Sequence, residues 1–413
     1  MTSDEADHRS ATVPVTNGAS KKLPRNVKIL GLASLLNDIA SEMVFPLLPA
    51  FLIQVLHGTK TSLGLMEGVA DSVSSLLRLF SGAWSDRAGS RKVFVIFGYA
   101  LAALARPLSG LAGRQWHLFA TRTADRIGKG IRTSPRDALI ADSTMPEMRG
   151  RAFGFHQAMD HLGAAVGPLL AMLFLFIWPR QLRTLFFLTL IPGILVVVLI
   201  TVALREKPHS EPKEKPALPQ SLRPLNWRFR FYLIALVLFT LGNSSDAFLL
   251  VRSSELGVQQ SLLPLLWCLF HIVKTVSNLV AGHWTDRTGA RPLLIIGWLA
   301  YGAVYLCFAL ASVAWHAWAI FLIYGFVYSL TEPAAKAMVT ELVPAERKGL
   351  AFGWFHFAIG VGALPSSLIF GWLYDDFGAW TAFGWGATSA ALASMLLLID
   401  PAIGRARLPP SHS

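Results

Sequence analysis

A short stretch of the chain, residues 122–142 (RTADRIGKGIRTSPRDALIAD), carries many charged side chains at the spacing of a helix. At roughly 100° per residue, one side of this helix would carry cations and carboxylates together. They are Arg122, Asp125, Arg126, Lys129, Arg132, Arg136 and Asp137. Such a face can bind anions through charge-assisted hydrogen bonds, or its charges can be taken up by ion pairs with neighbouring helices. The sequence leaves both interpretations open.

The segments around this stretch are apolar. The chain has 413 residues, of which 53% are hydrophobic and 15% are charged, whereas globular proteins carry about 25% charged residues. The apolar runs at 93–112 and 152–177 are each long enough to cross a bilayer. We therefore predict an all-α integral membrane protein in which the charged helix faces a water-filled interior rather than lipid.

The distribution of positive charge indicates a membrane topology. The net charge of +12 would suit a nucleic-acid partner, but Lys and Arg gather mainly in short loops on one side of the expected spans, as the positive-inside rule describes. We expect the bilayer as partner, no nucleic acid, and both termini in the cytoplasm of a bacterial-type inner membrane. We also expect no enzyme activity, cofactor or metal site, because no catalytic or metal-binding motif occurs in a supporting context.

The chain divides into two similar halves. We expect a disordered cytoplasmic tail at 1–28, a six-helix bundle at 29–204, a cytoplasmic linker at 205–228, a second six-helix bundle at 229–402 and a tail at 403–413. The loop sequence GAWSDRAGSR at 82–91 recurs 200 positions later as GHWTDRTGAR, and Pro135 is matched by Pro333. Such a repeat predicts twelve transmembrane helices in two pseudo-symmetric bundles, a known transporter architecture.

The repeated loop resembles the signature G-x-x-x-D-R-x-G-R-R/K of the major facilitator superfamily (MFS), and the resemblance covers residues 28 to 402. In this family the loop is thought to act as a cytoplasmic gate. The glycines permit a tight turn, and the Asp can cap a helix or pair with an Arg. Ser90, Ala290 and Pro292 replace basic residues of the signature, so we expect weaker latching in the second half. The resemblance assigns the gate to Gly82, Asp86, Arg87, Gly89, Arg91, Gly282, Asp286, Arg287, Gly289 and Arg291.

A second motif points to export. Gly154, Gly163, Gly167 and Pro168 resemble the span-five motif of the drug/proton antiporters of the same superfamily, although Ala171 and Met172 stand where a closing glycine pair is usual. Small residues let helices approach closely and proline bends a span, so ordinary helix packing is the alternative explanation. Pro135 and Pro333 are likewise expected to break or kink spans four and ten.

The resemblance also implies which residues line the central cavity, because the family fold lines it with spans one, four, seven and ten. The charged stripe should then face the cavity, with Arg126 standing where the family's span-four motif has a glycine. Our candidates for binding a solute are Arg122, Arg126, Lys129, Arg132, Asn37 and Asn243. Our candidates for proton coupling are Asp38, Glu42, His156, Asp160 and Asp246, which include two pairs spaced four residues apart.

Together these patterns predict a secondary active transporter that works as a monomer by alternating access. Its expected task is proton-coupled efflux of a small polar solute, anionic or zwitterionic. One alternative is a multidrug or cation/proton antiporter in which Asp38 and Glu42 bind the solute. Another is a non-transporting membrane sensor or scaffold on the same fold. The charges could also be structural ion pairs between spans one, two and four, since Glu67, Asp71 and Arg78 lie in span two.

Overall fold

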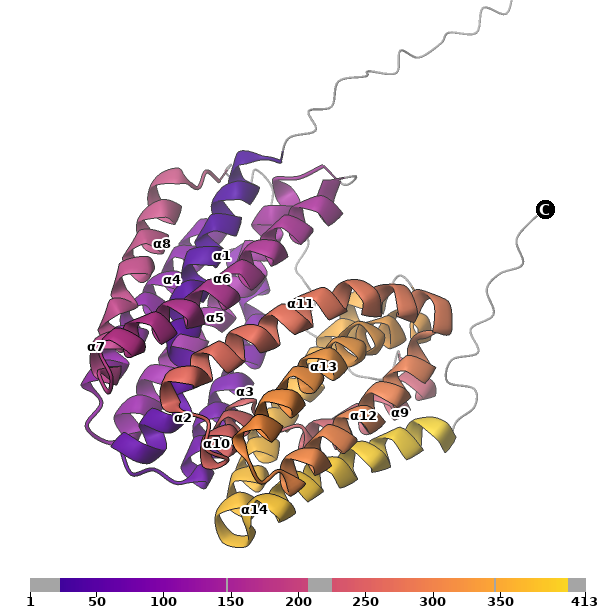
Figure 1. Ribbon diagram of the computed structural model, residues 1–413. Helices are drawn as coiled ribbons and strands as arrows, with labels where there is room; N and C mark the ends of the chain where they lie inside the picture. Colours follow the sequence, from indigo (N-terminus) through magenta and orange to yellow (C-terminus); the bar gives the residue numbers. More distant parts are fainter. Residues whose placement is uncertain (1–22, 146–147, 207–224, 345–346, 400–413) are drawn as a thin grey trace, which may run out of the picture.

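The computed structural model describes residues 23–145, 148–206, 225–344 and 347–399, and within them the chain is helical without strands. The helices form two bundles (Figure 1), one from the first half of the chain and one from the second. We call the end of the molecule where α1 begins and α8 ends the linker side, and the opposite end the far side.

The first bundle contains six long rods. The first rod is α1 (Arg25–Val44), extended by the short turns η1 (Phe45–Leu47), α2 (Leu48–Ala50) and η2 (Phe51–Val55). The next are α3 (Lys60–Arg87), α4 (Arg91–Leu108) with η3 (Ser109–Leu111), α5 (Gln115–Asp142) and α6 (Arg149–Ile177). The sixth rod is α7 (Leu182–Leu188) followed by α8 (Leu190–Ala203).

The second bundle repeats this plan with two differences. Its rods are α9 (Trp227–Gly242) with α10 (Ala247–Glu255), then, after η5 (Gln260–Leu262), α11 (Leu263–Thr288), α12 (Ala290–Leu310), α13 (Ala314–Leu342) and α14 (Lys348–Ile399). The first rod is interrupted between Gly242 and Ala247. The last holds two spans, because Gly378 takes a non-helical conformation with φ 83° in its middle. The described residues therefore form the twelve expected spans, six in each bundle.

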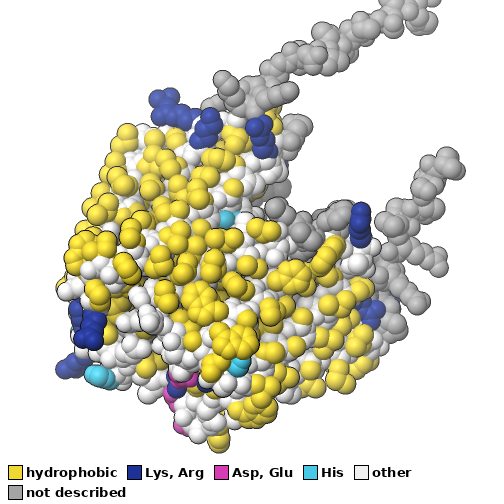
Figure 2. All heavy atoms as spheres, viewed as in Figure 1, with side chains coloured by type: hydrophobic (Ala, Val, Ile, Leu, Met, Phe, Trp, Pro, Cys, Tyr) yellow, Lys and Arg dark blue, Asp and Glu magenta, His cyan; other side chains and the backbone are white. Residues whose placement is uncertain are grey.

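Nine segments of the described chain are long and apolar enough to cross a membrane. The heavily charged helices α3 and α5 are not among these segments, and both are enclosed by other helices: α5 packs against α3 and α4, and α3 packs against α14. Side chains exposed on the outside are mostly apolar, for example Phe176 (81% exposed) and Val202 (78%). Figure 2 shows this apolar face, with Lys and Arg near its edges. The charged residues in the middle of α3 and α5, such as Glu67, Arg122 and Asp125, are therefore buried, while the apolar surface suits lipid.

Glycines set the position of α5 and α6. A Cβ atom at Gly128 would lie 2.5 Å from the carbonyl oxygen of Gly98 on α4, so only glycine allows this approach. In α6, a Cβ at Gly163 would lie 2.8 Å from the Cβ of Asp38, and one at Gly167 would lie 2.6 Å from the carbonyl oxygen of Ile39. The two glycines thus let α6 pack directly against the part of α1 that carries carboxylates.

Some expected boundaries differ from those observed. α1 begins at Arg25 and α9 at Trp227, so each bundle starts a few residues before the expected 29 and 229. Pro135, Pro168 and Pro333 lie inside continuous helices, so none of them ends its helix. Most of the expected tails and linker (1–22, 207–224 and 400–413) lie outside the described residues.

Candidate functional site

A cavity of about 450 Å³ lies between the two bundles. The first bundle lines it with residues of α1, η1, α3 and α5, and the second with α9, the break after α9, α11, α13 and α14. Charged side chains come mainly from the first bundle, whereas the second contributes hydroxyl, amide and aromatic groups.

The break in span seven supplies much of the second bundle's wall. α9 ends at Gly242, and Asn243 leaves helical geometry with φ −90° and ψ 85°. Its side-chain oxygen accepts a hydrogen bond from the Tyr301 hydroxyl (2.9 Å), and Asp246 accepts one from Tyr324 (2.6 Å). Irregular backbone at membrane depth is tolerated where it lines a cavity and finds partners of this kind.

Part of the charged stripe of α5 is taken up by neighbouring helices. The Arg122 guanidinium donates to both carboxylate oxygens of Glu67 on α3, at 2.9 and 2.7 Å, and both side chains are buried. Asp125 pairs with Arg106 of α4 at 2.8 Å. These contacts join spans two, three and four, so the structural explanation holds for Arg122 and Asp125.

Three other cations line the cavity. Arg126 lies 3.7 Å from the Asp71 carboxylate, a loose pair whose Nε makes no hydrogen bond. Lys129 and, from α3, Arg78 also line the cavity, and within the described part of the chain no ion pair involves either of them. The first bundle's wall thus carries these three cations beside three carboxylates, Glu42, Glu67 and Asp71. Because Glu67 is already bonded to Arg122, the cations can still hold an anionic group.

Arg132 points elsewhere. It is 4% exposed, and its guanidinium carbon lies 4.5 Å from the centre of the Tyr99 ring on α4. Its Nε and Nη1 atoms make no hydrogen bond within the described residues. Arg132 therefore contacts the face of an aromatic ring and does not line the cavity.

The proton-coupling candidates fall into two groups. Glu42 and Asp246 line the cavity. Asp38 of α1 and His156 and Asp160 of α6 are outside its lining. His156 Nδ1 is 3.6 Å from the Asp160 carboxylate. Asp38 accepts a hydrogen bond from Asn37 (2.8 Å), whose own oxygens accept from Arg106.

One contact in the cavity joins the two bundles. The indole N–H of Trp267 on α11 donates to Glu42 of α1 at 2.8 Å. Trp267 also lies against Phe45, with ring centroids 4.9 Å apart. Glu42 thus lines the cavity and is also bonded to the second bundle.

Several lining residues were not among the sequence candidates: Glu67, Asp71, Arg78, Trp267, His271 and Tyr328. The internal repeat contains a signal for some of them. Trp267 and His271 stand 200 positions after Glu67 and Asp71, the same offset as the repeated loop. Applying the same offset of 200 to the spans before the loops would have aligned Glu67 with Trp267 and Asp71 with His271.

The two copies of the repeated loop lie on the linker side, and their final arginines bond to different groups. In the first copy, Arg91 donates to Asp86 (2.9 and 2.7 Å) and also pairs with Asp142 at the end of α5. In the second, Arg291 donates to the carbonyl oxygen of Leu397 (2.6 Å).

The turn glycines and remaining gate residues are placed as follows. Gly89 and Gly289 have positive φ values of 69° and 84°, which glycine adopts without strain. Gly82 faces Ser134 of α5, and Arg87 and Arg287 are exposed. The surroundings of Gly282 and of the Asp286 side chain lie outside what the structure describes.

Comparison with known proteins finds a matching family and similar relatives. The family described as Major Facilitator Superfamily matches residues 30–266 and 232–413. An uncharacterised MFS-type transporter of Methanocaldococcus jannaschii is 31% identical over 92% of this chain and 96% of its own length. The multidrug resistance protein MdtH of Baumannia cicadellinicola is 22% identical over 81% of this chain and 80% of its own.

The fold likeness extends to solved structures. A bacterial homologue of the human lysosomal transporter Spinster, in an inward-facing and occupied conformation, superposes with a TM-score of 0.71 at 16% identity, covering 91% of this chain and 95% of that one. The family match spans both bundles, and the motifs, the twelve spans and the cavity between the bundles agree with it. The chain belongs to the major facilitator superfamily and is a membrane transporter of that family.

Proposed function

We propose that this transporter exports a small polar solute, anionic or zwitterionic, in exchange for protons, by alternating access of the central cavity to the two sides of the membrane. In this proposal the linker side is cytoplasmic and the protein is a monomer of a bacterial-type inner membrane. The observation that carries the proposal is the set of three cavity cations, Arg78, Arg126 and Lys129, of which only Arg126 lies within 4 Å of a carboxylate oxygen among the described residues.

Binding of the solute's anionic group is assigned to these cations. Arg presents a planar fork that suits carboxylate or phosphate groups, and Lys adds a compact charge beside it. Because Arg122 is already paired with Glu67, it contributes by holding α5 in place rather than by contacting solute. Asn243 lies on the opposite wall, where its amide N–H₂ group can donate to the solute.

Proton coupling is assigned first to Glu42 and Asp246, since both line the cavity. A proton on either carboxyl group makes the cavity more positive, which favours an anion but disfavours a cationic group. Exchange requires competition between proton and solute. Of the two proposed solute classes, a zwitterion supplies this competition, because its ammonium group can replace the proton while its anionic group contacts Lys129. Asp38, His156 and Asp160 stay candidates for relaying protons along α1 and α6.

A multidrug or cation/proton antiporter is the second candidate function. It is supported by the likeness to MdtH and by the aromatic lining residues Trp267 and Tyr328, which could hold a lipophilic cation near Asp246. The span-five glycines favour export in both cases.

The test uses protein reconstituted in liposomes with an internal pH dye. The panel contains amino acids as zwitterions, their N-acetyl derivatives as anions, their amides as cations, and lipophilic cations. We expect the zwitterions to move protons in the opposite direction to themselves, and both Asp246→Asn and Lys129→Met to abolish this. Proton movement with lipophilic cations alone, retained in Lys129→Met, would establish the multidrug alternative. Solute flux without any proton movement would overturn proton coupling.

A further inference from the structure

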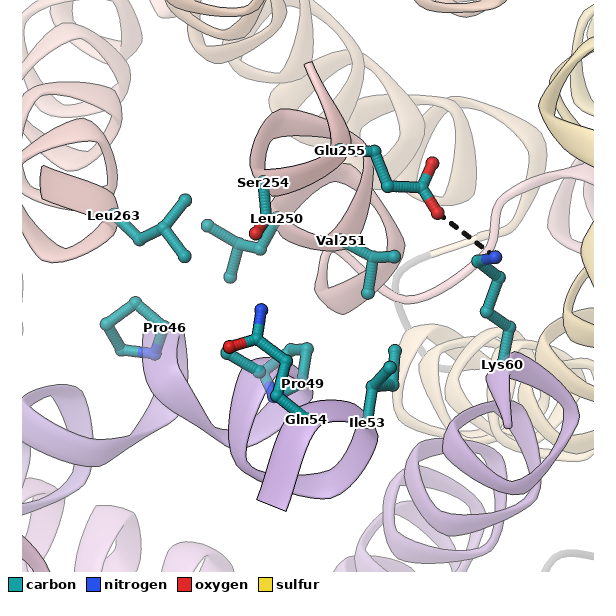
Figure 3. A pocket seen from close by; sticks show the side chains of 11 residues that line it. Pro46, Pro49, Ile53, Gln54, Lys60, Leu250, Val251, Ser254, Glu255 and Leu263 are labelled. Atoms are coloured by element: carbon teal, nitrogen blue, oxygen red, sulfur yellow. Dashed lines mark ion pairs between the residues drawn. The ribbon is translucent and has the colours of Figure 1, made fainter. Parts of the chain in front are cut away.

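A second, smaller pocket lies on the far side, between the end of span one and α10. Its volume is about 240 Å³, and it is lined by apolar residues such as Pro46, Leu250 and Leu263, with Lys60 and Glu255 at one edge. Figure 3 shows the side chains of the two bundles facing each other across it and the Lys60–Glu255 ion pair beside it. Nothing in the transport site described above uses this pocket.

The pocket continues the line of the cavity along the same helices. On span one the cavity lining ends at Phe45 and the pocket lining begins at Pro46. On α11 the corresponding residues are Trp267 and Leu263, one helical turn apart. The contact between Phe45 and Trp267, with centroids 4.9 Å apart, lies between the two spaces.

The outer edge of the pocket is held by carboxylates of the second bundle. Asp375, at the far-side end of the first span of α14, accepts hydrogen bonds from the backbone N–H groups of Lys60 (3.0 Å) and Thr61 (2.6 Å) and from the Thr61 hydroxyl (2.7 Å). It therefore caps the N-terminus of α3 across the boundary between bundles. Glu255 pairs with Lys60 at 3.0 Å and accepts from the Tyr374 hydroxyl at 2.6 Å.

Glycines allow the helices to come this close. A Cβ atom at Gly371 would lie 2.5 Å from the carbonyl oxygen of Lys60, and one at Gly68 would lie 2.9 Å from the Cα of Leu364. A Cβ at Gly64 would clash with the carbonyl oxygen of Ser367. The obstacle is backbone at all three positions, so a larger residue there cannot be accommodated by turning a side chain.

We infer that the far-side pocket is the outer part of the solute path, and that Asp375 and Glu255 hold it shut by fastening α3 to the second bundle. This inference rests on the proposed alternating access. Opening toward the far side must break the Asp375 cap and the Lys60–Glu255 pair and separate the glycine contacts between α3 and α14. Asp375 is a positioning residue in this scheme, since it contacts the helix rather than the solute.

The first test measures distance across the far side. Spin labels at Arg114→Cys and Gln259→Cys, in a background with Cys268→Ser and Cys307→Ser, report the separation of the bundles by pulsed electron paramagnetic resonance. We expect Asp375→Ala to shift the ratio of open to closed populations about tenfold toward longer distances, and Gly64→Ala to shift it further. Asp376→Ala, an exposed neighbour, and Gly384→Ala, whose added Cβ meets nothing within 4 Å, are the matched controls.

The second test asks whether the pocket becomes accessible. Ser254→Cys, within the pocket lining, is treated with a membrane-impermeant thiol reagent from the far side. We expect its modification rate to rise about tenfold with Asp375→Ala and to stay unchanged with Asp376→Ala. Wild-type distances and rates in both Asp375→Ala and Gly64→Ala would overturn the inference. Both readouts are conformational, so a chain that shows these shifts yet moves no solute would contradict the proposed function alone.

Discussion

The two halves share one fold but are stabilised by different interactions at equivalent positions. At the offset of 198 that relates Pro135 to Pro333, Arg122 and Arg126 of α5 correspond to Ile320 and Tyr324 of α13. Arg126 lies 3.7 Å from the Asp71 carboxylate of α3, whereas its counterpart Tyr324 stacks on Phe270 of α11, with ring centroids 5.5 Å apart. At these positions the first half therefore uses charged contacts between helices, and the second uses aromatic packing.

The same contrast separates α3 from α11. Glu67 and Asp71 on α3 face the cavity where Trp267 and His271 stand on α11. Burying apolar and aromatic surface is favourable by itself, but burying a charge requires a partner that compensates for lost hydration. Among the described residues neither Arg78 nor Lys129 forms an ion pair, which costs stability, and in our proposal solute binding accounts for this arrangement.

The largest expected effect breaks the buried pair of the first half. Arg122→Met leaves the Glu67 carboxylate buried without a partner, which should destabilise the protein by about 3–5 kcal/mol. Ile320→Val, at the equivalent position of the second half, should cost only about 1 kcal/mol. Thermal unfolding in detergent measures both changes.

A double variant sharpens this result. Replacing both Arg122 and Glu67 by apolar residues of similar size should recover most of the lost stability, because replacing a whole buried pair is often neutral. Equal losses in Arg122→Met and Ile320→Val would show that the two halves are stabilised alike.

Lys129→Met should separate stability from binding. Loss of a charge-assisted hydrogen bond should weaken solute affinity about 10- to 100-fold, whereas the unfolding temperature should not fall, because a cation without an ion-pair partner has been removed. Titration of the exported solute against wild type and variant, with thermal unfolding in parallel, tests both parts. A drop in stability with unchanged affinity would place Lys129 among the structural charges.

In the second half, the hydroxyl groups around span seven should matter unequally. Tyr324→Phe removes a hydrogen bond to the Asp246 carboxylate and should cost about 2 kcal/mol, whereas Tyr301→Phe removes a bond to the Asn243 amide and should cost about 1 kcal/mol. Thermal unfolding compares them, and the liposome assay shows whether only Tyr324→Phe weakens proton movement. Identical results for the two variants would contradict a special position for Asp246.

The smallest expected effect concerns the repeated loops. Arg91 bonds two carboxylates and Arg291 bonds main-chain carbonyl oxygens, so Arg91→Gln should destabilise the protein by about 1 kcal/mol more than Arg291→Gln. Chemical or thermal unfolding of the paired variants measures the difference. A larger loss in Arg291→Gln would reverse our expectation of weaker latching in the second half.

Much of the fold could be predicted from sequence because membrane spans and turns depend on local patterns. Apolar runs of sufficient length and the repeated loop predicted the membrane spans and the two bundles, and Gly89 and Gly289 occupy turns with positive φ. The charged helices α3 and α5 needed the repeat as well, since their composition alone is not that of a membrane span.

Which residues line the cavity was harder to predict from the sequence. Periodicity placed Arg122, Arg126, Lys129 and Arg132 on one side of α5, and the structure divides them among Glu67, the cavity and the Tyr99 ring. The break at Asn243 was also not visible, since no proline or glycine pair marks it and its partner Tyr301 is distant in sequence.

The sequence by itself thus determined the membrane class, the number of spans, the internal repeat and the presence of charged residues within the spans. These features depend on composition and on residues close together in the chain. Tertiary structure alone decided which charges are neutralised, which face the cavity, and that Asp375 fastens α3 on the far side. These outcomes depend on pairs such as Arg122–Glu67 and Thr61–Asp375, separated by 55 and 314 residues. Contacts between such distant residues are set by the way helices pack, which local patterns do not contain.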